Sequence, residues 1–346
     1  MQLSGCVQTC TIVLGAATAL GLAVAAQAQT VAEFYRGKTI MIVVGTDAGG
    51  TYDQSARMMA RGLQRRIPGN PAVSVQNMGG ANGIPAFNHV FNVAPKDGTV
   101  IGAMTRLSPY EPLMGNANAR YDVSKLRWLG STASEVGVSM AWRTAPHKRA
   151  EDLFTTELLI GATVPGGDTH VYPYALNQLL GTKYKIITGY PSQEPIGLAM
   201  ERGEVQGSGS WSWSNIPHSH PDWLKEKKIS LLFQLGLEKH PELPDVPLPT
   251  EFAKTDEQRD ILALLMGMKK FGYPFFIAPG VPKERADALA KAFDEVLEDP
   301  EFLAEAKLQG RPYGMARGQE MTGLIQKSYA LPKATIDRAR EILNVK

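Results

Sequence analysis

The sequence predicts an α/β protein with two lobes, and three observations lead to this prediction. Apolar runs rich in β-branched residues alternate with segments of helical spacing along the chain. Several of these runs are followed by a glycine-containing loop and then by a helical segment, which is the order of a parallel sheet flanked by helices. The scheme occurs near the N-terminus and again in the middle of the chain. We therefore expect each lobe to be a mainly parallel sheet with helices on its faces.

The first occurrence of this scheme lies between residues 39 and 105. Its opening run, TIMIVV, is typical of a strand that is buried on both faces. Apolar residues then return at helical spacing from Ala56 to Ile67, and Pro68 stops that helix. The expected strands are 39–44, 72–77 and 98–105, with glycine loops at 45–51 and 78–83 and a short helix through Phe87 and Val90.

The middle of the chain repeats the scheme, and the C-terminal part is mostly helical. The expected elements are strands at 157–164, 183–190, 204–211 and 273–280, and helices at 170–180, 196–203 and 282–299. We divide the chain into an N-terminal segment 1–28, a discontinuous first lobe of 29–134 plus 236–346, and a second lobe of 135–235. Ligands bind at the carboxyl ends of strands in open α/β sheets, so two facing lobes predict a ligand cleft.

The first 28 residues differ in character from the rest of the chain. The run TIVLGAATALGLAVAAQA is uncharged and apolar, and it ends in the A-x-A form that signal peptidases cleave. We interpret 1–28 as a cleaved signal peptide, with a retained membrane anchor as the alternative, and expect a periplasmic protein. Because Cys6 and Cys10 both lie in this segment, the mature chain is expected to have no thiol for a disulfide, a nucleophile or a metal site.

The loop VVGTDAGGTYD at 43–53 partly matches a phosphate-binding loop. Gly45 and Gly50 have the required spacing, but Thr51 and Tyr52 stand where Lys and Ser or Thr are needed. No lysine in this loop can neutralise a nucleotide phosphate. Glycine loops still let backbone N–H groups approach an anion, and a helix N-terminus adds partial positive charge. This loop therefore fits a carboxylate better than a nucleotide. The net charge of +2, with Lys and Arg scattered along the chain, predicts no nucleic-acid partner.

Beyond these patterns, the ordered series of motifs resembles one family along nearly the whole mature chain. The family opens with a strand and an AGG-(S/T)-x-D loop, which YRGKTIMIVVGTDAGGTYD resembles. The family's VVVEN(R)PGAGG strand and loop is similar to VSVQNMGGANG, and its APPDGYTLL segment is similar to APKDGTVIG. ITGYPSQEPIGLAMERGEV, LPDVPLPTEF and FFIAPGVPKERADALAKAF follow in the family's order. The chain is thus similar to the substrate-binding proteins of tripartite tricarboxylate transporters, the TctC or Bug family.

This resemblance implies a type II periplasmic-binding-protein fold, a two-lobed "Venus flytrap", without catalysis or a cofactor. It implies a monomeric receptor that delivers a small carboxylate to a membrane permease of one large and one small subunit. The ligand would be held by main-chain amides of the two first-lobe glycine loops. The residues expected at the ligand are Asp47, Ala48, Gly49, Gly50, Thr51, Gly79, Gly80, Ala81, Asn82 and Thr105 in the first lobe, and Thr163, Gly166, Gly167, Asp168, His170 and Ser210 in the second.

Several of these residues also have a purely structural explanation. Glycine pairs occur in ordinary turns, and Asp53 in the first helical turn is expected to be a cap or dipole partner. Arg106 can pair with a ligand carboxylate or lie at the surface. His170 can donate to a carboxylate or cap its helix, and Ser210 replaces an Asp that the family often carries.

Asp47 departs from the family, which has proline or another uncharged residue in this stretch. A carboxylate inside an anion site repels an anionic ligand or occupies its donors. Asp47 therefore either turns outward to solvent or selects a ligand with a cationic or hydrogen-bond-donor group. Asp47 therefore argues against a simple dicarboxylate as the ligand.

Other motifs in the sequence give weaker support to other functions. The tryptophans of GSWSW, Trp211 and Trp213, are expected to be core residues rather than a stacking platform. His218 and His220 have poor spacing for a metal site. A hydrolase is disfavoured because the chain has no G-x-S-x-G elbow. A ligand-sensing protein that signals to a sensor kinase would use the same cleft and remains an alternative.

Overall fold

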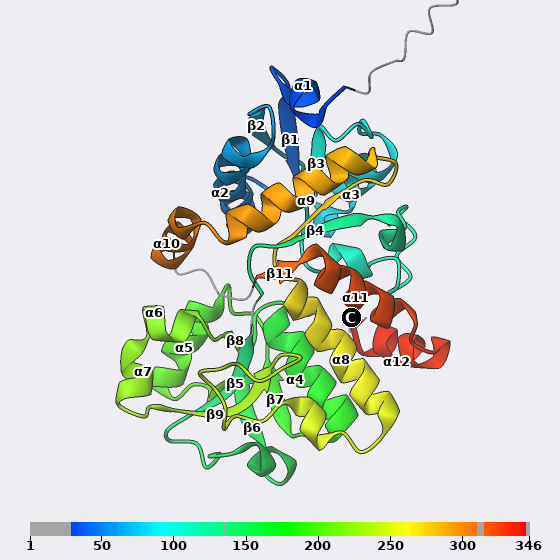
Figure 1. Ribbon diagram of the computed structural model, residues 1–346. Coiled ribbons are helices and arrows are strands. Elements are labelled where there is room, and N and C mark those ends of the chain that lie inside the picture. The colour runs from blue at the N-terminus through cyan, green and yellow to red at the C-terminus, as the bar shows by residue number, and fades with distance from the viewer. Residues whose placement is uncertain (1–28, 135, 310–314, 344–346) are drawn as a thin grey trace, which may run out of the picture.

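The computed structural model describes residues 29–134, 136–309 and 315–343. Two sheets flanked by helices form two lobes, one above the other in Figure 1. The two-lobed α/β fold expected from the sequence is therefore confirmed. The expected signal peptide 1–28 lies outside the described residues. Across the described ranges, no helix has the length and apolar character needed to cross a membrane.

The first lobe is built on a six-stranded sheet with the order β11-β4-β10-β3-β1-β2. Its strands are β1 (Thr39–Val44), β2 (Ala72–Asn77), β3 (Val100–Ala103), β4 (Arg127–Ser131), β10 (Pro274–Ile277) and β11 (Ala316–Arg317). β1 pairs in parallel with β2 and with β3, as the strand–loop–helix order predicts. β10 runs antiparallel to both β3 and β4, and β11 runs antiparallel to β4.

The second lobe is built on a five-stranded sheet with the order β7-β6-β8-β5-β9. Its strands are β5 (Gly137–Trp142), β6 (Leu158–Gly161), β7 (Tyr184–Ile187), β8 (Gly207–Ser212) and β9 (Ile229–Leu235). β6 is parallel to β7 and β8, whereas β5 is antiparallel to β8 and β9. The three strands expected from the sequence between 157 and 211 are all present.

Both sheets are mixed, which corrects the expectation of mainly parallel sheets. The chain leaves the first sheet through β4 and enters the second through β5; it returns through β9 and β10. β4 lies beside β10, and β5 lies beside β9. In each sheet, the strand through which the chain leaves or enters lies beside the strand through which it returns. The two strands run in opposite directions and therefore form an antiparallel pair. The lobe boundaries at 134/135 and 235/236 stay a prediction.

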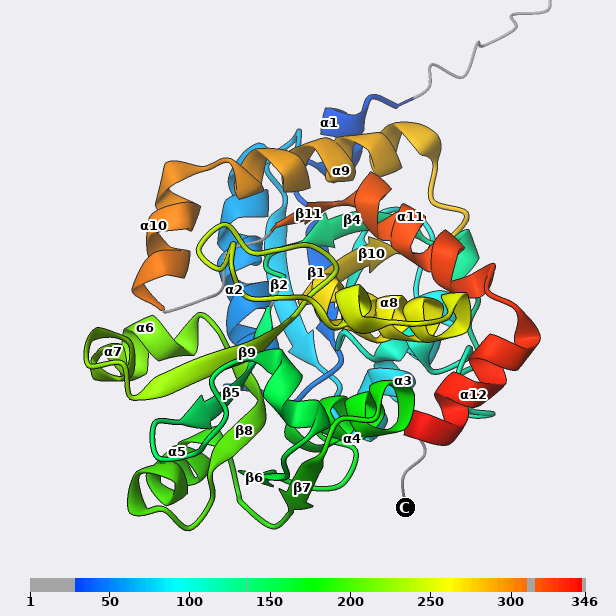
Figure 2. The same ribbon diagram turned by 90° about the horizontal axis from the view of Figure 1, so that it is seen from below.

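Helices cover the faces of both sheets (Figures 1 and 2). They are α1 (Val31–Tyr35), α2 (Thr51–Arg66), α3 (Ile84–Asn92), α4 (Asp168–Leu180), α5 (Gln193–Arg202), α6 (Asn215–Ser219), α7 (Pro221–Lys225), α8 (Asp256–Phe271), α9 (Lys283–Leu297), α10 (Pro300–Leu308), α11 (Gly318–Tyr329) and α12 (Lys333–Leu343). α2 and α9 pack on each other and on the first sheet, where Leu63 and Val296 are fully buried. Such burial of an apolar face supplies most of a helix's stability in a folded protein.

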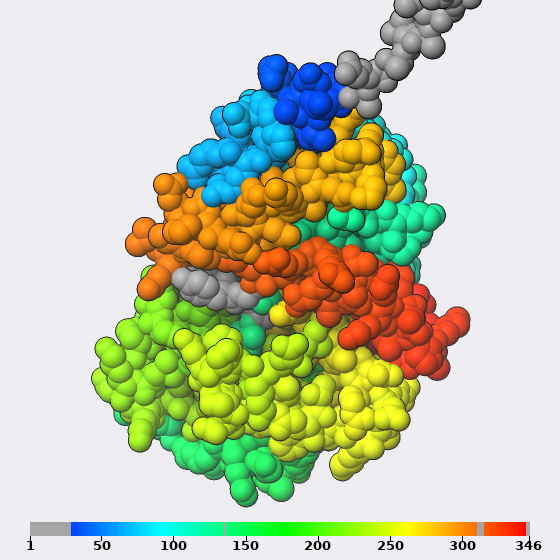
Figure 3. Space-filling view, viewed as in Figure 1, coloured from blue at the N-terminus to red at the C-terminus, as the bar shows by residue number. Residues whose placement is uncertain are grey.

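The lobes are joined by apolar packing as well as by strands. α8 contacts α4, α11 and α12, so it lies between the second sheet's helix and the C-terminal helices. One cluster of buried side chains extends from Phe87 near the first sheet through Leu265 of α8 to Leu176 of α4. On the face seen in Figure 3, the C-terminal helices cover the junction between the lobes. The segments that follow β2 and β3 reach this junction, because Asn82 and Leu107 lie beside Gly166 and Asp168 of the second lobe there.

Candidate ligand-binding cleft

The three parallel strands of the first lobe end level with one another. Val44 of β1 is in register with Asn77 of β2 and with Ala103 of β3. The loops that follow are joined at their bases, because Gly45 N donates to Ala103 O at 2.9 Å and Met78 N donates to Val44 O at 2.8 Å. The two predicted glycine loops therefore start side by side at the carboxyl edge of the sheet, where open α/β sheets bind ligands.

Asp53 braces the first glycine loop from the first turn of α2. Its carboxylate is 3% exposed and accepts hydrogen bonds from Gly49 N at 2.8 Å, Asn77 Nδ2 at 3.0 Å and Arg57 Nε at 3.0 Å. Burial alone would raise the pKa of Asp53, but the hydrogen bonds from Arg57, Gly49 and Asn77 outweigh it and hold that pKa below its usual range. Asp53 is thus a structural residue, and the Gly49 N–H is used within the loop.

Asp47 lies across the second glycine loop instead of pointing away from it. A Cβ built on Gly79 would stand 2.1 Å from Asp47 Oδ1, so the carboxylate rests directly on the Gly79 backbone. Asp47 is exposed, as are Ala48, Gly50 and Thr51. Among the described residues, no Lys, Arg or His lies within 4.0 Å of the Asp47 carboxylate. An uncompensated carboxylate therefore stands between the two loops.

The second glycine loop has an unusual backbone. Four consecutive residues have positive φ: Gly80 at 95°, Ala81 at 43°, Asn82 at 54° and Gly83 at 80°. For a non-glycine residue this left-handed conformation costs about 1–2 kcal/mol. Strain of this kind persists only where the surroundings impose it, and it concentrates at functional sites. Ala81 and Asn82 are both exposed, so the loop presents its backbone outward.

Side chains of the third loop hold this strained segment in place. Asn82 O accepts a hydrogen bond from Thr105 Oγ1 at 3.0 Å and another from Ser108 Oγ at 2.5 Å. Asn82 Nδ2 donates to Glu111 Oε1 at 3.1 Å, and the other oxygen of Glu111 accepts from Asn116. The hydroxyl of Thr105, predicted to contact the ligand, therefore positions the second glycine loop.

The second-lobe loop is closed by its own hydroxyl groups. Thr163 N donates to Thr169 Oγ1 at 2.8 Å, and the two threonine hydroxyls are also 2.8 Å apart. Gly167 N donates to Val164 O across a turn in which Gly166 has φ 83°. The Pro-Gly turn needs glycine at this position because φ is positive there. Thr163 and the two glycines therefore fix the start of α4.

Asp168 connects the second lobe to the rest of the cleft. Its Oδ2 accepts from Arg106, which follows β3, and from Lys269 Nζ of α8 at 3.0 Å. Lys269 is 2% exposed and its Nζ lies 4.4 Å from the centre of the Tyr172 ring. Burial would raise the pKa of Asp168, but Lys269 and Arg106 together hold that pKa below its usual range. Arg106, for which a surface role was equally open, bridges the lobes.

A cavity of about 260 Å³ opens between the lobes next to this ion-pair cluster. Asn82 and Glu111 line it from the first lobe, and Gly166 and Asp168 line it from the second. Apolar side chains form the remaining wall: Leu107, Tyr110, Met114, Val171, Tyr172, Leu265, Met268 and Leu343. The structure thus brings three of the predicted site residues, Asn82, Gly166 and Asp168, to one interlobe cavity.

His170 and Ser210 do not line this cavity. His170 is 8% exposed, stacks on Tyr174 and has a buried Nδ1 with no partner in the described structure; burial lowers its pKa. Ser210 is buried in β8, with its Oγ close to Gly137. Both residues are part of the second-lobe interior, because α4 and β8 pack against each other there.

The aromatic and histidine motifs of the second lobe have structural partners. Trp211 is fully buried against Trp223, and Trp213 Nε1 donates to Glu242 Oε2 at 2.8 Å. His220 stacks on Trp223 at 4.0 Å and its Nε2 lies 2.8 Å from Glu194 Oε2. These tryptophans belong to the core of the lobe, as expected.

Sequence reasoning missed Lys269 and Glu111. Lys269 was detectable in principle, because it follows Leu262 and Met266 at helical spacing and so falls on the apolar face of α8. A lysine at such a position needs an acidic partner. Glu111 lies in an irregular segment after a short 3-10 turn, and no periodic signal marks it.

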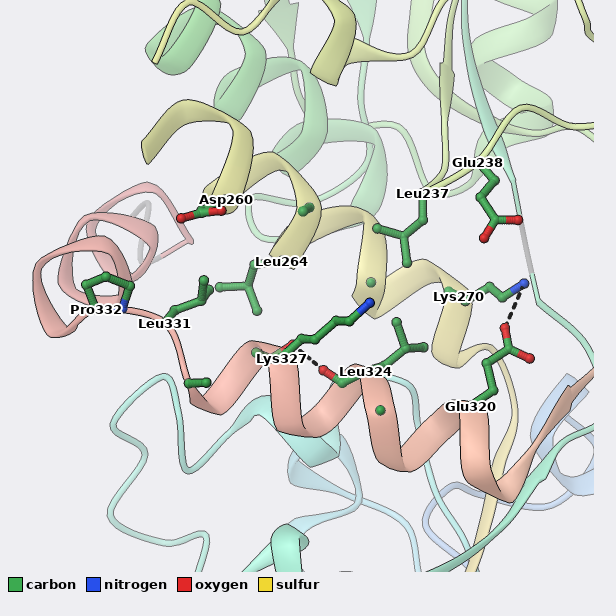
Figure 4. A pocket seen from close by; sticks show the side chains of 15 residues that line it. Leu237, Glu238, Asp260, Leu264, Lys270, Glu320, Leu324, Lys327, Leu331 and Pro332 are labelled. Atoms are coloured by element: carbon green, nitrogen blue, oxygen red, sulfur yellow. Dashed lines mark hydrogen bonds and ion pairs between the residues drawn. The ribbon is translucent and has the colours of Figure 1, made fainter. Parts of the chain in front are cut away.

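A second, larger groove of about 880 Å³ runs between α8 and α11 (Figure 4). Its floor is apolar, with Leu264 and Leu324 among its residues, and Lys270 pairs with Glu320 across it at 3.1 Å. It contains none of the predicted site residues, so the interlobe cleft is the better candidate for a ligand site.

Comparison with known proteins establishes the fold. No family profile matches the sequence, and no curated protein matches it. A TctC solute binding protein from Polaromonas superposes with a TM-score of 0.70 at 15% identity, covering 90% of this chain and 99% of the other. The periplasmic binding protein BugD gives a TM-score of 0.52 at 20% identity, with coverage of 89% and 97%.

MatC from Rhodopseudomonas palustris, solved with bound malate, gives a TM-score of 0.54 at 18% identity. The superposition covers 89% of this chain and 99% of MatC. The similarities span nearly the full length of each of these three structures. The chain therefore has the two-lobed fold of the TctC and Bug periplasmic binding proteins, as its motifs indicate.

Proposed function

We propose that this protein is a periplasmic receptor that binds a small carboxylate between its lobes. The observation that carries this proposal is the second glycine loop, where four successive residues with positive φ are held at the cleft by Thr105 and Ser108. An ordinary turn does not need such a strained backbone, which costs free energy. Strain that is fixed by hydroxyl groups at a cleft is expected where the backbone itself contacts a ligand.

The chemistry of the cleft supports capture of a carboxylate without turnover. Backbone amides and the N-terminus of α2 attract negative charge, and Arg106 and Lys269, both paired with Asp168, place cationic groups at the same cleft. The fold relatives are binding proteins, and one of them holds malate. The resemblance of the motifs further supports export through the segment 1–28 and delivery to a permease of one large and one small subunit.

A thermal-unfolding screen of residues 29–346 tests this function. The panel holds L-malate, succinate, citrate and L-aspartate, with ATP as a control. A carboxylate at about one hundred times its dissociation constant adds roughly 2.7 kcal/mol of stability, a shift of a few degrees for a chain of this size. The ligand should be recovered unchanged. A response to ATP alone, or consumption of the ligand, contradicts the receptor function.

A matched pair of variants locates the site. Gly80 in the second loop and Gly203 at the end of α5 both have positive φ and open space around a Cβ. Gly80 has φ 95° and ψ 154°, a region that essentially only glycine adopts, whereas Gly203 has φ 75° and ψ 17° in the left-handed helical region. Gly80→Ala is therefore the more strained variant, and the ligand-induced shift of each variant is taken from its own unliganded midpoint. Gly80→Ala should weaken the ligand-induced shift, and Gly203→Ala should leave it intact. Equal ligand responses from both variants would place the site elsewhere.

A further inference from the structure

If the cleft binds a small carboxylate as proposed above, the charges on its loops limit which carboxylate fits. Asp47 lies within the first glycine loop, and its Oδ1 rests on Gly79 of the second. The Asp47 carboxylate repels a ligand carboxylate that approaches the same loops. Either one of the two carboxylates becomes protonated, or one of them gives up its hydrogen-bond donors. A plain dicarboxylate therefore meets an opposing charge at Asp47.

In the described part of the chain, the other acids at the cleft already have partners, which sets Asp47 apart. Asp53 is bound by Arg57 and by two further donors. Glu111 accepts from the amides of Asn82 and Asn116. Asp168 is shared by two cations. For Asp47, the described residues provide no cation within 4.0 Å. Asp47 is exposed and its Oδ1 lies over Gly79 of the second glycine loop, where it can accept from a ligand that contacts this loop.

A cationic group stands on the neighbouring loop. Asp47 is the third residue after Val44, the end of β1, and Arg106 is the third after Ala103, the end of β3. Val44 and Ala103 are in register on adjacent strands. The segment that holds Arg106 also contacts the first turn of α2, since Arg106 N donates to Tyr52 OH at 3.2 Å. An acid and a base on adjacent loops of one cleft complement a ligand that carries both charges.

We propose that the ligand is a carboxylate that also carries a protonated amine, and that Asp47 is the residue that recognises the amine. The ammonium group donates to the Asp47 carboxylate, while the ligand carboxylate faces the loop amides and the side of the cleft that holds Arg106. This arrangement converts the repulsion at Asp47 into a charge-assisted hydrogen bond. It also explains why an acid is tolerated in a loop otherwise suited to anions.

Two matched ligand pairs test the role of Asp47. L-Aspartate and L-malate share one skeleton and differ by an ammonium in place of a hydroxyl, as do L-glutamate and L-2-hydroxyglutarate. Isothermal titration of residues 29–346 should give at least tenfold tighter binding of the amino acid in one pair, which corresponds to about 1.4 kcal/mol. Asp47→Asn should remove most of that preference while still binding the hydroxy acid.

Two further variants keep the test specific. Gly79→Ala forces the Asp47 carboxylate away, because the new Cβ would overlap Oδ1, and should reduce the preference as Asp47→Asn does. Glu257→Gln removes an exposed acid in the first turn of α8 that does not line the cavity, and should change the preference less than twofold. Thermal unfolding without ligand verifies that each variant is folded.

The possible outcomes separate the two proposals. Equal binding of amino and hydroxy acids in both pairs, or a preference that survives Asp47→Asn, overturns the role of Asp47 and leaves the carboxylate receptor intact. Binding of neither member of either pair, together with no response to succinate or citrate, overturns both proposals.

Discussion

Asp53 and Asp168 occupy similar places in the two lobes but do different work. Each lies in the first turn of a helix that follows a strand and a glycine loop, and each helix has a glycine N-cap without a side-chain cap. Asp53 binds groups of its own lobe, the Gly49 N–H and Arg57. Asp168 binds Arg106 and Lys269, which reach it from β3 and α8. The same sequence pattern thus gives Asp53 contacts within the first lobe and gives Asp168 a contact between the lobes, which we call the bridge.

The difference comes from what stands opposite each carboxylate. Arg57 is one turn along the same helix and its side chain is 47% exposed, so water already solvates much of its charge. Lys269 is 2% exposed, and its side chain has exchanged water for Asp168 and the Tyr172 ring. Removing the partner of a buried charge costs far more than removing the partner of an exposed one. Replacement of Asp168 should therefore destabilise the protein more than replacement of Asp53.

The largest effect is expected from Asp168→Asn. This change leaves the buried Lys269 ammonium without the Asp168 carboxylate, and we expect a loss of about 3 kcal/mol in the free energy of unfolding. The lobes should also separate more often, because the only change is to a contact between them. Urea unfolding measures the first effect, and small-angle X-ray scattering measures the second as a larger radius of gyration.

Lys269→Met provides the complementary change. It removes the buried charge and keeps an apolar side chain of similar length, so its cost should be smaller than that of Asp168→Asn. If Asp168→Asn leaves both the stability and the radius of gyration unchanged, Asp168 does not act as a bridge.

Asp53→Asn should cost less, about 1–2 kcal/mol, because neutral hydrogen bonds replace charge-assisted ones around an exposed arginine. The radius of gyration should stay the same. The folded-state pKa of Asp53 is lowered, so its contribution is complete above the unfolded pKa of about 3.9 and is lost as the pH falls through the folded pKa. Urea midpoints measured from pH 6 downward should therefore converge for wild type and Asp53→Asn. Parallel curves would contradict the assignment.

Periodic features of the fold were predictable from sequence, and cross-lobe contacts were not. The strands 39–44 and 72–77 match β1 and β2 residue for residue, because alternation and β-branched runs are local signals. The mixed direction of the sheets was missed, since the pairing of β4 with β10 joins segments far apart in the chain. Local patterns carry no information about which distant strand becomes a neighbour.

The candidate site shows the same limit. The sequence placed both glycine loops at one sheet edge, because parallel strands share a carboxyl edge, and the strands that precede them do end in register. Asn82, Gly166 and Asp168 line one cavity, and their contact with a ligand stays a prediction. His170 and Ser210 were expected at the ligand by resemblance, yet both are buried in the second lobe. A motif gives the position of a residue along a helix or strand, whereas the direction of its side chain depends on packing against partners that the motif does not contain.

The smallest effects should come from the glycines beside the two acids. Gly49 has φ 87° and Gly166 has φ 83°, and a Cβ at either position would meet no atom within 4 Å. Gly49→Ala and Gly166→Ala should each cost about 1 kcal/mol, since left-handed strain of about 1–2 kcal/mol is partly offset by the lower entropy of the unfolded chain. The two variants should lose similar amounts of free energy of unfolding.

The same two variants should differ in how they affect the lobes. Gly49→Ala strains a loop that Asp53 holds within the first lobe, so the radius of gyration should not change. Gly166→Ala strains the turn that precedes Asp168 and should weaken the contact with Arg106 and Lys269, which shifts the scattering curve toward the open form. If neither variant changes the scattering, the turn around Gly166 does not position Asp168, and the bridge is set by Arg106 and Lys269 alone.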